Sequence, residues 1–431
     1  MSRLLVMCVD ALFTDDLADV RHLPGFSEIL SKAAIYENVY CVYPTLTYVC
    51  HATIMTGCWP EHHGIPHNQR LDPPTRNAAW YWNYGDLKVK TLFDYAKQSG
   101  LTTGGIGWPV TAAAPSIDCN IPEIWTVNKN VTVEEAYRYG CSATGFNLYS
   151  EHKHLLDNNT HPNLEKFDIA CLEQMIHEDC PDVILTHQAQ LDHVRHLHGV
   201  HAPEVQDALR MHDEWIQRVI SALKEEGLFE DTYFVILGDH GHLQVDYKIS
   251  PNMLLERAGL LDVNEEGEVT SWRAYVQSSG ISAQLFLEDP QFLDPAQQAL
   301  KPLIDQNLIS DVFTFNEAQE RFHVAGEFSL MMEASANYAF GDDATGALVT
   351  AADSSDYKYA VSTHGHLPFR GEAPCFIVSG PGISSGRFAG ARLIDEAPTL
   401  MDLVGIDYDK TSIDGEALLT NPRIVRLPEA V

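Results

Sequence analysis

Four short runs of apolar residues have the length and composition of buried β-strands. They span residues 4–9, 183–185, 233–237 and 375–379, and polar residues or glycine follow each of them. Apolar runs without alternation are typical of parallel strands covered by helices on both faces. The pattern therefore predicts a mostly parallel sheet in the interior of the protein.

Helical patterns lie between these runs. Residues 202–226 place apolar side chains at roughly helical spacing, and Gly227 follows as a helix stop. Residues 91–99, followed by Gly100, form a shorter pattern of the same kind. Because helices alternating with strands are typical of doubly wound α/β proteins, we expect an α/β/α sandwich.

The pattern changes in the second half of the chain. Strand-like runs at residues 280–287, 311–315 and 328–333 surround a helical pattern at residues 295–306. Strands grouped around one helix indicate a small α+β unit rather than a continuation of the parallel sheet.

The length of the chain also favours two units. With 431 residues, it exceeds what one hydrophobic core usually organises. We predict a catalytic core domain made of residues 1–254 and 356–431, with an inserted α+β subdomain at residues 255–355.

The charge balance restricts the partners. Lys and Arg number 28 and Asp and Glu number 60, which gives a formal net charge of −32. Such a chain repels nucleic-acid polymers and anionic membranes, so we expect neither as a partner. A small anionic substrate remains compatible with this charge, because bound cations reverse the local field. The oligomeric state stays open.

Cysteine usage and the N-terminus bear on the cellular location. The nine cysteines are an odd number and form no CxxC pair, which favours reduced thiols. The apolar stretch before Asp10 is too short for a signal peptide, and no window approaches the roughly 18 apolar residues of a membrane span. We therefore expect a cytoplasmic protein.

Aspartate and histidine residues follow the predicted strands or lie in loops. They are Asp10, Asp192, His196, Asp239, His240 and His364. In open α/β sheets, sites form beyond the carboxyl ends of the strands, so these dispersed residues can meet in one place. Asp and His ligands without clustered cysteine suit zinc or manganese, and this number is enough for two ions. Two such ions can activate a nucleophile and stabilise an in-line phosphoryl displacement.

One loop motif makes the interpretation more specific. It reads Pro44-Thr45-Leu46-Thr47-Tyr48-Val49-Cys50-His51, followed by Thr56-Gly57 and by His63-Gly64. Together with the Asp-x-x-x-His, Gly-Asp-His-Gly and Thr-His-Gly elements in this order, it resembles the alkaline phosphatase superfamily, and within it the nucleotide pyrophosphatase/phosphodiesterase family.

This resemblance implies a fold, a nucleophile and two ligand sets. The implied fold is an alkaline-phosphatase-like α/β/α sandwich, and the implied nucleophile is Thr47. One metal ion is expected between Asp10, Thr47, Asp239 and His240, and the other between Asp192, His196 and His364. Zinc is the expected metal, with manganese as the alternative.

The chain departs from the family motif in two places. Val49 stands where the family has proline, and Cys50 stands where it has an asparagine that contacts a phosphate oxygen. We expect Cys50 to contact the substrate, although a thiol is only a weak donor. Cys50 as the nucleophile is the alternative to Thr47. The sulfatases, a sister family, require Cys-x-Pro-x-Arg, which the residues after Cys50 do not supply.

The combined motifs predict a two-metal phosphodiesterase or nucleotide pyrophosphatase that acts through a phosphothreonine. A phosphomonoesterase or a phosphonate hydrolase on the same scaffold is the alternative, and a non-catalytic metal- or phosphate-binding protein is a third interpretation. Residues 43–69 contain no Lys or Arg, which favours singly charged diesters over dianionic monoesters. Arg195 is the nearest candidate cation. The aromatic tract at residues 80–84 is either a wall for a substrate base or part of the core.

Overall fold

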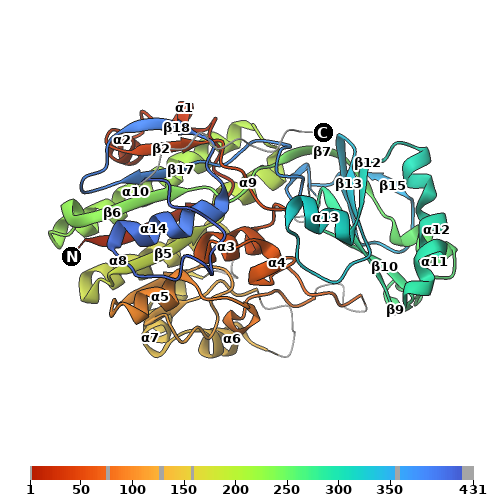
Figure 1. Cartoon of the computed structure of the whole chain (residues 1–431), viewed down its shortest axis with the longest axis horizontal. Helices are drawn as coiled ribbons and strands as arrows, with labels where there is room; N and C mark the ends of the chain where they lie inside the picture. The colour runs from red at the N-terminus through yellow and green to blue at the C-terminus, as the bar shows by residue number, and fades with distance from the viewer. Residues whose placement is uncertain (1, 74–77, 126–130, 157–159, 355–359, 420–431) are drawn as a thin grey trace.

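The computed structural model describes residues 2–73, 78–125, 131–156, 160–354 and 360–419. Figure 1 shows a large sheet covered by helices and, beyond one end of its strands, a smaller unit. The strands of the large sheet are, in spatial order, β18 (Gly386–Ala389), β2 (Ala34–Glu37), β17 (Phe376–Ser379), β6 (Thr232–Leu237), β1 (Arg3–Val9), β5 (Val183–Gln188), β3 (Thr103–Ile106) and β4 (Cys119–Ile121).

The four predicted strands are confirmed as β1, β5, β6 and β17. The pairs of β1 with β5 and β6 are parallel, as are those of β3 with β4 and β5, and that of β18 with β2. β17 differs, because it runs antiparallel to both of its neighbours, β2 and β6. Its apolar run reflects burial on both faces and carries no information about strand direction.

Helices cover both faces of the sheet. Leu4 and Val6 of β1 belong to a core with α3 (Thr47–Thr56), α5 (Leu92–Gln98) and α14 (Glu396–Val404). Leu5 and Met7 point to the other face, which α2 (Pro24–Leu30), α8 (Asn163–Asp179) and α10 (Pro203–Glu225) cover. This alternation along β1 produces the predicted three-layer sandwich. Shorter helices complete this unit: α1 (Leu17–Val20), α4 (Pro60–His63), α6 (Val133–Gly140), α7 (Ala143–His152) and α9 (Gln190–His198).

The smaller unit contains an antiparallel sheet and three helices. The sheet has the order β10 (Ala274–Ser278), β11 (Ser282–Leu287), β13 (Leu330–Ala334) and β12 (Ile309–Thr314). The helices are α11 (Asn252–Arg257), α12 (Leu293–Asp305) and α13 (Phe315–Phe322). The predicted strands in this region correspond to β11, β12 and β13, and the predicted helix to α12. A hairpin of β8 (Leu261–Val263) and β9 (Val269–Trp272) adds to them.

The boundary between the units differs from the predicted residue 255. β7 (Leu243–Ile249) pairs with β14 (Asn337–Phe340), β15 (Val349–Ala351) and β16 (Ser362–Thr363). Val245 and Ile249 of β7 belong to the apolar core of the smaller unit. Sheet pairing therefore assigns β7 to that unit, although it lies in the predicted core domain. Residues 355–359, at the second predicted boundary, and residues 420–431 lie outside the described residues.

A buried carboxylate joins the two units. Glu333 on β13 accepts hydrogen bonds from the Tyr43 hydroxyl (2.9 Å), the Leu367 backbone N–H (3.0 Å) and the Arg370 guanidinium (2.8 Å). Tyr43 and Leu367 belong to loops that flank the carboxyl ends of the large sheet's strands. The smaller unit thus fixes loops at the edge of the sheet where the site is expected. Among the described residues, no helix is long and apolar enough to cross a membrane.

Candidate active site

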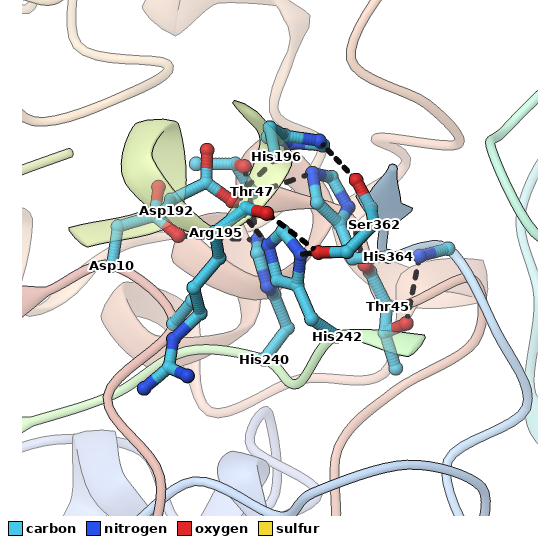
Figure 2. A network of polar contacts seen from close by, with 12 residues as sticks. Asp10, Thr45, Thr47, Asp192, Arg195, His196, His240, His242, Ser362 and His364 are labelled. Atoms are coloured by element: carbon cyan, nitrogen blue, oxygen red, sulfur yellow. Dashed lines mark hydrogen bonds and ion pairs between the residues drawn. The ribbon is translucent and has the colours of Figure 1, made fainter. Parts of the chain in front are cut away.

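The seven residues expected at the two ions lie together at this edge of the sheet, and Figure 2 labels all of them except Asp239. Asp10 follows β1, and Asp239 and His240 follow β6 after one glycine. The other positions are Thr47 at the first residue of α3, Asp192 and His196 one turn apart on α9, and His364 directly after β16. Each is at most 7 % exposed. Parallel strands that end at one edge explain how residues far apart in sequence converge.

The first group surrounds the Thr47 hydroxyl. Thr47 Oγ lies 3.1 Å from His240 Nε2. The same nitrogen lies 3.3 Å from Asp10 Oδ1 and 3.4 Å from Asp239 Oδ2. A hydroxyl, two carboxylates and one imidazole are therefore directed at one point.

The second group forms around Asp192. Its Oδ1 lies 3.4 Å from His196 Nε2 and 3.8 Å from His364 Nε2. The other ring nitrogen of each histidine donates to a backbone carbonyl. His196 Nδ1 donates to Ser362 O (2.8 Å), and His364 Nδ1 donates to Thr45 O (3.0 Å). Because a carbonyl only accepts, each Nδ1 carries the proton and each Nε2 presents its lone pair, as in metal-binding histidines.

The two groups adjoin each other. Ligand atoms of Asp10, Asp192 and His240 all lie within 4.8 Å of one another. The rings of His240 and His364 stack with centroids 4.0 Å apart. This proximity is compatible with two ions that act on one substrate.

The donor atoms fit divalent cations. Asp10 Oδ1 and Asp239 Oδ2 are buried and accept no hydrogen bond within the described part of the chain. Burial and the neighbouring carboxylates Asp239 and Asp192 raise the pKa of Asp10 well above its usual value. Buried carboxylates that repel one another and lack donors are typical of a cation site.

The loop motif supplies both the nucleophile and its support. Leu46 is extended, and the helix begins at Thr47, so the hydroxyl lies at the N-terminus of α3, where the helix dipole favours a phosphate. Thr45 holds the His364 loop, because its carbonyl and hydroxyl oxygens lie 2.9 and 3.0 Å from the Gly365 N–H. The two threonines of Pro-Thr-Leu-Thr therefore have different functions.

Gly365 explains the glycine of the Thr-His-Gly element. Its φ is +84°, and a Cβ atom there would lie 1.7 Å from Ser279 O. Ile281 N–H and the Ser282 hydroxyl, both of the smaller unit, donate to His364 O (3.0 Å) and to Gly365 O (2.6 Å). The close approach of these backbones places His364, and a side chain at position 365 would prevent it.

A family model described as type I phosphodiesterase / nucleotide pyrophosphatase matches residues 4–366. The chain belongs to this family. The expected resemblance is thereby confirmed, and the matched region includes all seven candidate ligand residues.

Individual relatives are more distant. Ectonucleotide pyrophosphatase/phosphodiesterase family member 1 of Mus musculus is 25% identical over 233 residues, which cover 51% of this chain and 21% of that protein. Venom phosphodiesterase of Macrovipera lebetinus is 23% identical over 235 residues, with 52% and 23% covered. The aligned region thus spans about a fifth of the length of these relatives.

A solved structure supports the fold. Murine ectonucleotide pyrophosphatase / phosphodiesterase 5 superposes with a TM-score of 0.66 at 17% identity, covering 94% of this chain and 95% of that chain. The predicted alkaline-phosphatase-like α/β fold is confirmed by this similarity.

Cys50 does not lie where the family motif led us to expect it. Its side chain is fully buried in the apolar core around α3, beside the Cys41 thiol. Burial and the Cys41 thiol raise its pKa well above the usual value, which also argues against Cys50 as a nucleophile. The expected contact with the substrate is therefore not supported.

Asn68 lies beside the start of α3. Its Oδ1 accepts a hydrogen bond from the Tyr48 N–H (2.9 Å), which attaches the side chain to the N-terminus of α3, next to Thr47. The side-chain amide keeps an N–H₂ donor group for a ligand. Sequence reasoning missed Asn68, because its position depends on one long-range hydrogen bond and on no local motif.

Arg195, the nearest candidate cation, points away from Thr47 (Figure 2). Its side chain is fully buried, forms an ion pair with Asp16 (2.6 Å), and donates to Val200 O. The guanidinium also lies 3.8 Å from the centre of the Phe13 ring. These contacts hold the Arg195 side chain on the side of α9 that faces Asp16 and Phe13. Its function is therefore packing.

The aromatic tract packs on the core, as one of the two interpretations predicted. Trp80, Tyr81 and Trp82 pack on the core around α3 and stay partly exposed. The Trp80 ring lies 5.1 Å from the ring of Tyr48, the residue after the nucleophile, and 6.0 Å from the ring of Trp125. The tract therefore supports α3 and offers aromatic surface close to Thr47.

Proposed function

We propose that this chain is a phosphodiesterase or nucleotide pyrophosphatase that hydrolyses small phosphodiesters through Thr47. The observation that carries this proposal is the 3.1 Å approach of Thr47 Oγ to His240 Nε2, within a group that also contains Asp10 and Asp239. A hydroxyl among metal-binding groups at a helix N-terminus is the arrangement expected of an activated nucleophile.

Two divalent ions are part of the proposal. Asp10, Thr47, Asp239 and His240 would hold one ion, and Asp192, His196 and His364 the other. Such ions lower the pKa of a bound hydroxyl and stabilise negative charge on phosphoryl oxygens. Zinc suits these imidazole and carboxylate groups, and manganese is the alternative.

The chain's own residues account for two displacements at phosphorus. Thr47 Oγ loses its proton to solvent and attacks phosphorus in line, which forms the Thr47–phosphorus ester bond and breaks the bond to the leaving oxygen. The group leaves as an aryloxide, or as an alkoxide that takes up a proton from solvent. Water then attacks the same phosphorus, which releases the monoester and restores the Thr47 hydroxyl. In this proposal the Asn68 amide and the α3 N-terminus, which adjoin Thr47, bind the nonbridging oxygens. Covalent catalysis of this type divides one difficult step into two.

The charges near Thr47 favour diesters. A monoester presents a dianion, and enzymes specialised for dianions usually add fixed cations such as a bidentate arginine. Residues 43–69 contain no Lys or Arg, and Arg195 is bound to Asp16. A structural relative, murine ectonucleotide pyrophosphatase / phosphodiesterase 5, has an inactive threonine-to-alanine variant that was solved in complex with AMP. That complex supports nucleotides as the substrate class to test first.

A comparison of ester types tests the proposal. We expect kcat/KM for the p-nitrophenyl ester of thymidine 5′-monophosphate to exceed that for p-nitrophenyl phosphate at one pH with one metal. If the monoester is better by about tenfold or more, which corresponds to about 1.4 kcal/mol, the monoesterase alternative replaces the proposal. Phosphate release from phosphonoacetate alone would indicate a phosphonate hydrolase. Full metal occupancy without any turnover would indicate a binding protein.

A cytoplasmic location is a separate proposal. All nine cysteines are free thiols, and six of them are buried. Free thiols persist in a reducing compartment. Fractionation of the source cells tests this, and recovery of the chain outside the cytoplasmic fraction would refute it.

A further inference from the structure

His242 lies inside the second ligand group, although the family resemblance assigns it no function. The side chain is 1 % exposed. Its Nε2 lies 2.6 Å from Asp192 Oδ1, nearer than the Nε2 atoms of His196 (3.4 Å) and His364 (3.8 Å). Ligand atoms of all four residues lie within 4.8 Å of one another.

The hydrogen bonds of Ser362 determine which nitrogen of His242 carries the proton. Ser362 Oγ donates to Arg195 O (2.9 Å) and lies 2.8 Å from His242 Nδ1 (Figure 2). A hydroxyl has one proton, and the Arg195 carbonyl can only accept it. With its proton on the Arg195 carbonyl, Ser362 Oγ accepts from His242 Nδ1–H, and in the neutral imidazole Nε2 keeps its lone pair.

This tautomer directs a lone pair at a carboxylate. Nε2 of His242 and Oδ1 of Asp192 are then two electron-pair donors only 2.6 Å apart. Two such atoms repel each other, unless a proton or a metal ion lies between them. His196 and His364 have the same arrangement. Nδ1 of His196 donates to Ser362 O, Nδ1 of His364 donates to Thr45 O, and both Nε2 atoms are directed at Asp192. All three rings are therefore oriented as metal-binding histidines are.

We propose that His242 is a fourth protein ligand of the ion that Asp192, His196 and His364 hold. The proposal rests on the two-ion part of the proposed function and adds a residue to it. One carboxylate and three imidazoles complete a tetrahedral zinc shell, whereas catalytic sites usually keep three protein ligands. A substrate oxygen would then require expansion to five ligands.

The coordination distance tests the proposal directly. The full chain is loaded with zinc and crystallised, and anomalous scattering locates the ions. We expect Nε2 of His242 at about 2.0–2.1 Å from the ion near Asp192. An ion bound by Asp192, His196 and His364, with His242 hydrogen-bonded to Asp192 instead, overturns this inference and leaves the proposed function intact. Failure to bind zinc in either group contradicts both.

Variants give a second readout in solution. His242→Ala and His242→Gln are each compared with His62→Gln, a control in which the side chain replaced is 54 % exposed. Zinc affinity is measured by competition with a chelator. We expect both His242 variants to bind one ion at least about tenfold more weakly, and the control to match the wild type. Wild-type affinity in His242→Gln, whose amide N–H can still donate to Asp192, would show a positioning hydrogen bond and overturn the proposal.

Discussion

Thr47 Oγ lies 3.1 Å from Nε2 of His240, which itself lies 3.3 Å from Asp10 Oδ1. The three residues come from the start of α3, the loop after β6 and the end of β1. The hydroxyl is therefore one of the atoms that would surround an ion, and it also faces the point where a phosphoryl group would be bound. This relationship links nucleophile activation to metal binding.

Replacement of Thr47 tests whether this residue acts in catalysis rather than in folding or metal binding. Thr47→Ala should lower kcat for bis(p-nitrophenyl) phosphate by at least about a thousandfold, because covalent catalysis and hydroxyl activation both act through that oxygen. Thr47→Ser keeps the oxygen and is the matched control, for which we expect substantial activity. Metal content and Tm should change little in either variant, because Asp10, Asp239 and His240 remain to hold the ion next to position 47. A Thr47→Ala enzyme with more than a tenth of wild-type turnover would exclude Thr47 as the nucleophile.

Elemental analysis tests the two ligand groups. The wild type should hold two ions per chain. Asp192→Ala and His364→Ala should each lower occupancy of the same ion, while Asp239→Ala should lower that of the other. Chelation should also lower Tm, because ligands that bind the folded state stabilise it. Active enzyme with one ion or none would refute the two-ion arrangement.

The backbone at Gly365 offers a test of how the fold positions His364. Gly365→Ala should weaken binding of the ion at Asp192, because the new Cβ would lie 1.7 Å from Ser279 O and the His364 loop would have to move. Metal affinity and Tm are both measured. Unchanged metal affinity in this variant would show that the loop position does not determine the site.

Gly382→Ala is the matched control for that experiment. Gly382 also has a positive φ, +72°, but a Cβ atom there would meet nothing within 4 Å. Both substitutions should lower the free energy of unfolding by about 1–2 kcal/mol, because alanine is strained in the left-handed conformation. Loss of metal is expected only in Gly365→Ala, so the comparison separates backbone strain from the displacement of His364.

The strands and the clustering of the expected ligand residues were predictable, because they depend on local patterns. The apolar runs that became β1, β5 and β6 are strongly buried, and an expected ligand residue follows each run. Asp192 and His196 are four residues apart, which places them one turn apart on α9. The order of the motifs then identified the family.

The side-chain directions around the nucleophile were not predictable. All ten residues of α3 are buried, so the helix has no polar face that would indicate which side Cys50 occupies. The position of Asn68 depends on a hydrogen bond to the Tyr48 backbone. Arg195 is directed by Asp16, which is distant in sequence.

The predicted start of the subdomain lies later in the chain than the structure places it, for a related reason. β7 pairs with β14, β15 and β16, which all lie more than eighty residues further along the chain. Such pairing leaves no signal within β7 itself, because cross-strand packing decides where a strand belongs. The sequence pattern therefore predicted a subdomain that begins at residue 255, after β7, whereas strand pairing includes β7 in it.

The stereochemical course at phosphorus tests the central claim most directly. A thymidine 5′-phosphorothioate p-nitrophenyl diester of one configuration is hydrolysed in isotopically labelled water, and the configuration of the chiral product is determined. Each in-line displacement inverts phosphorus, so attack by Thr47 followed by attack of water predicts overall retention. Inversion would mean that water attacks the diester in a single step, and would contradict the covalent function of Thr47.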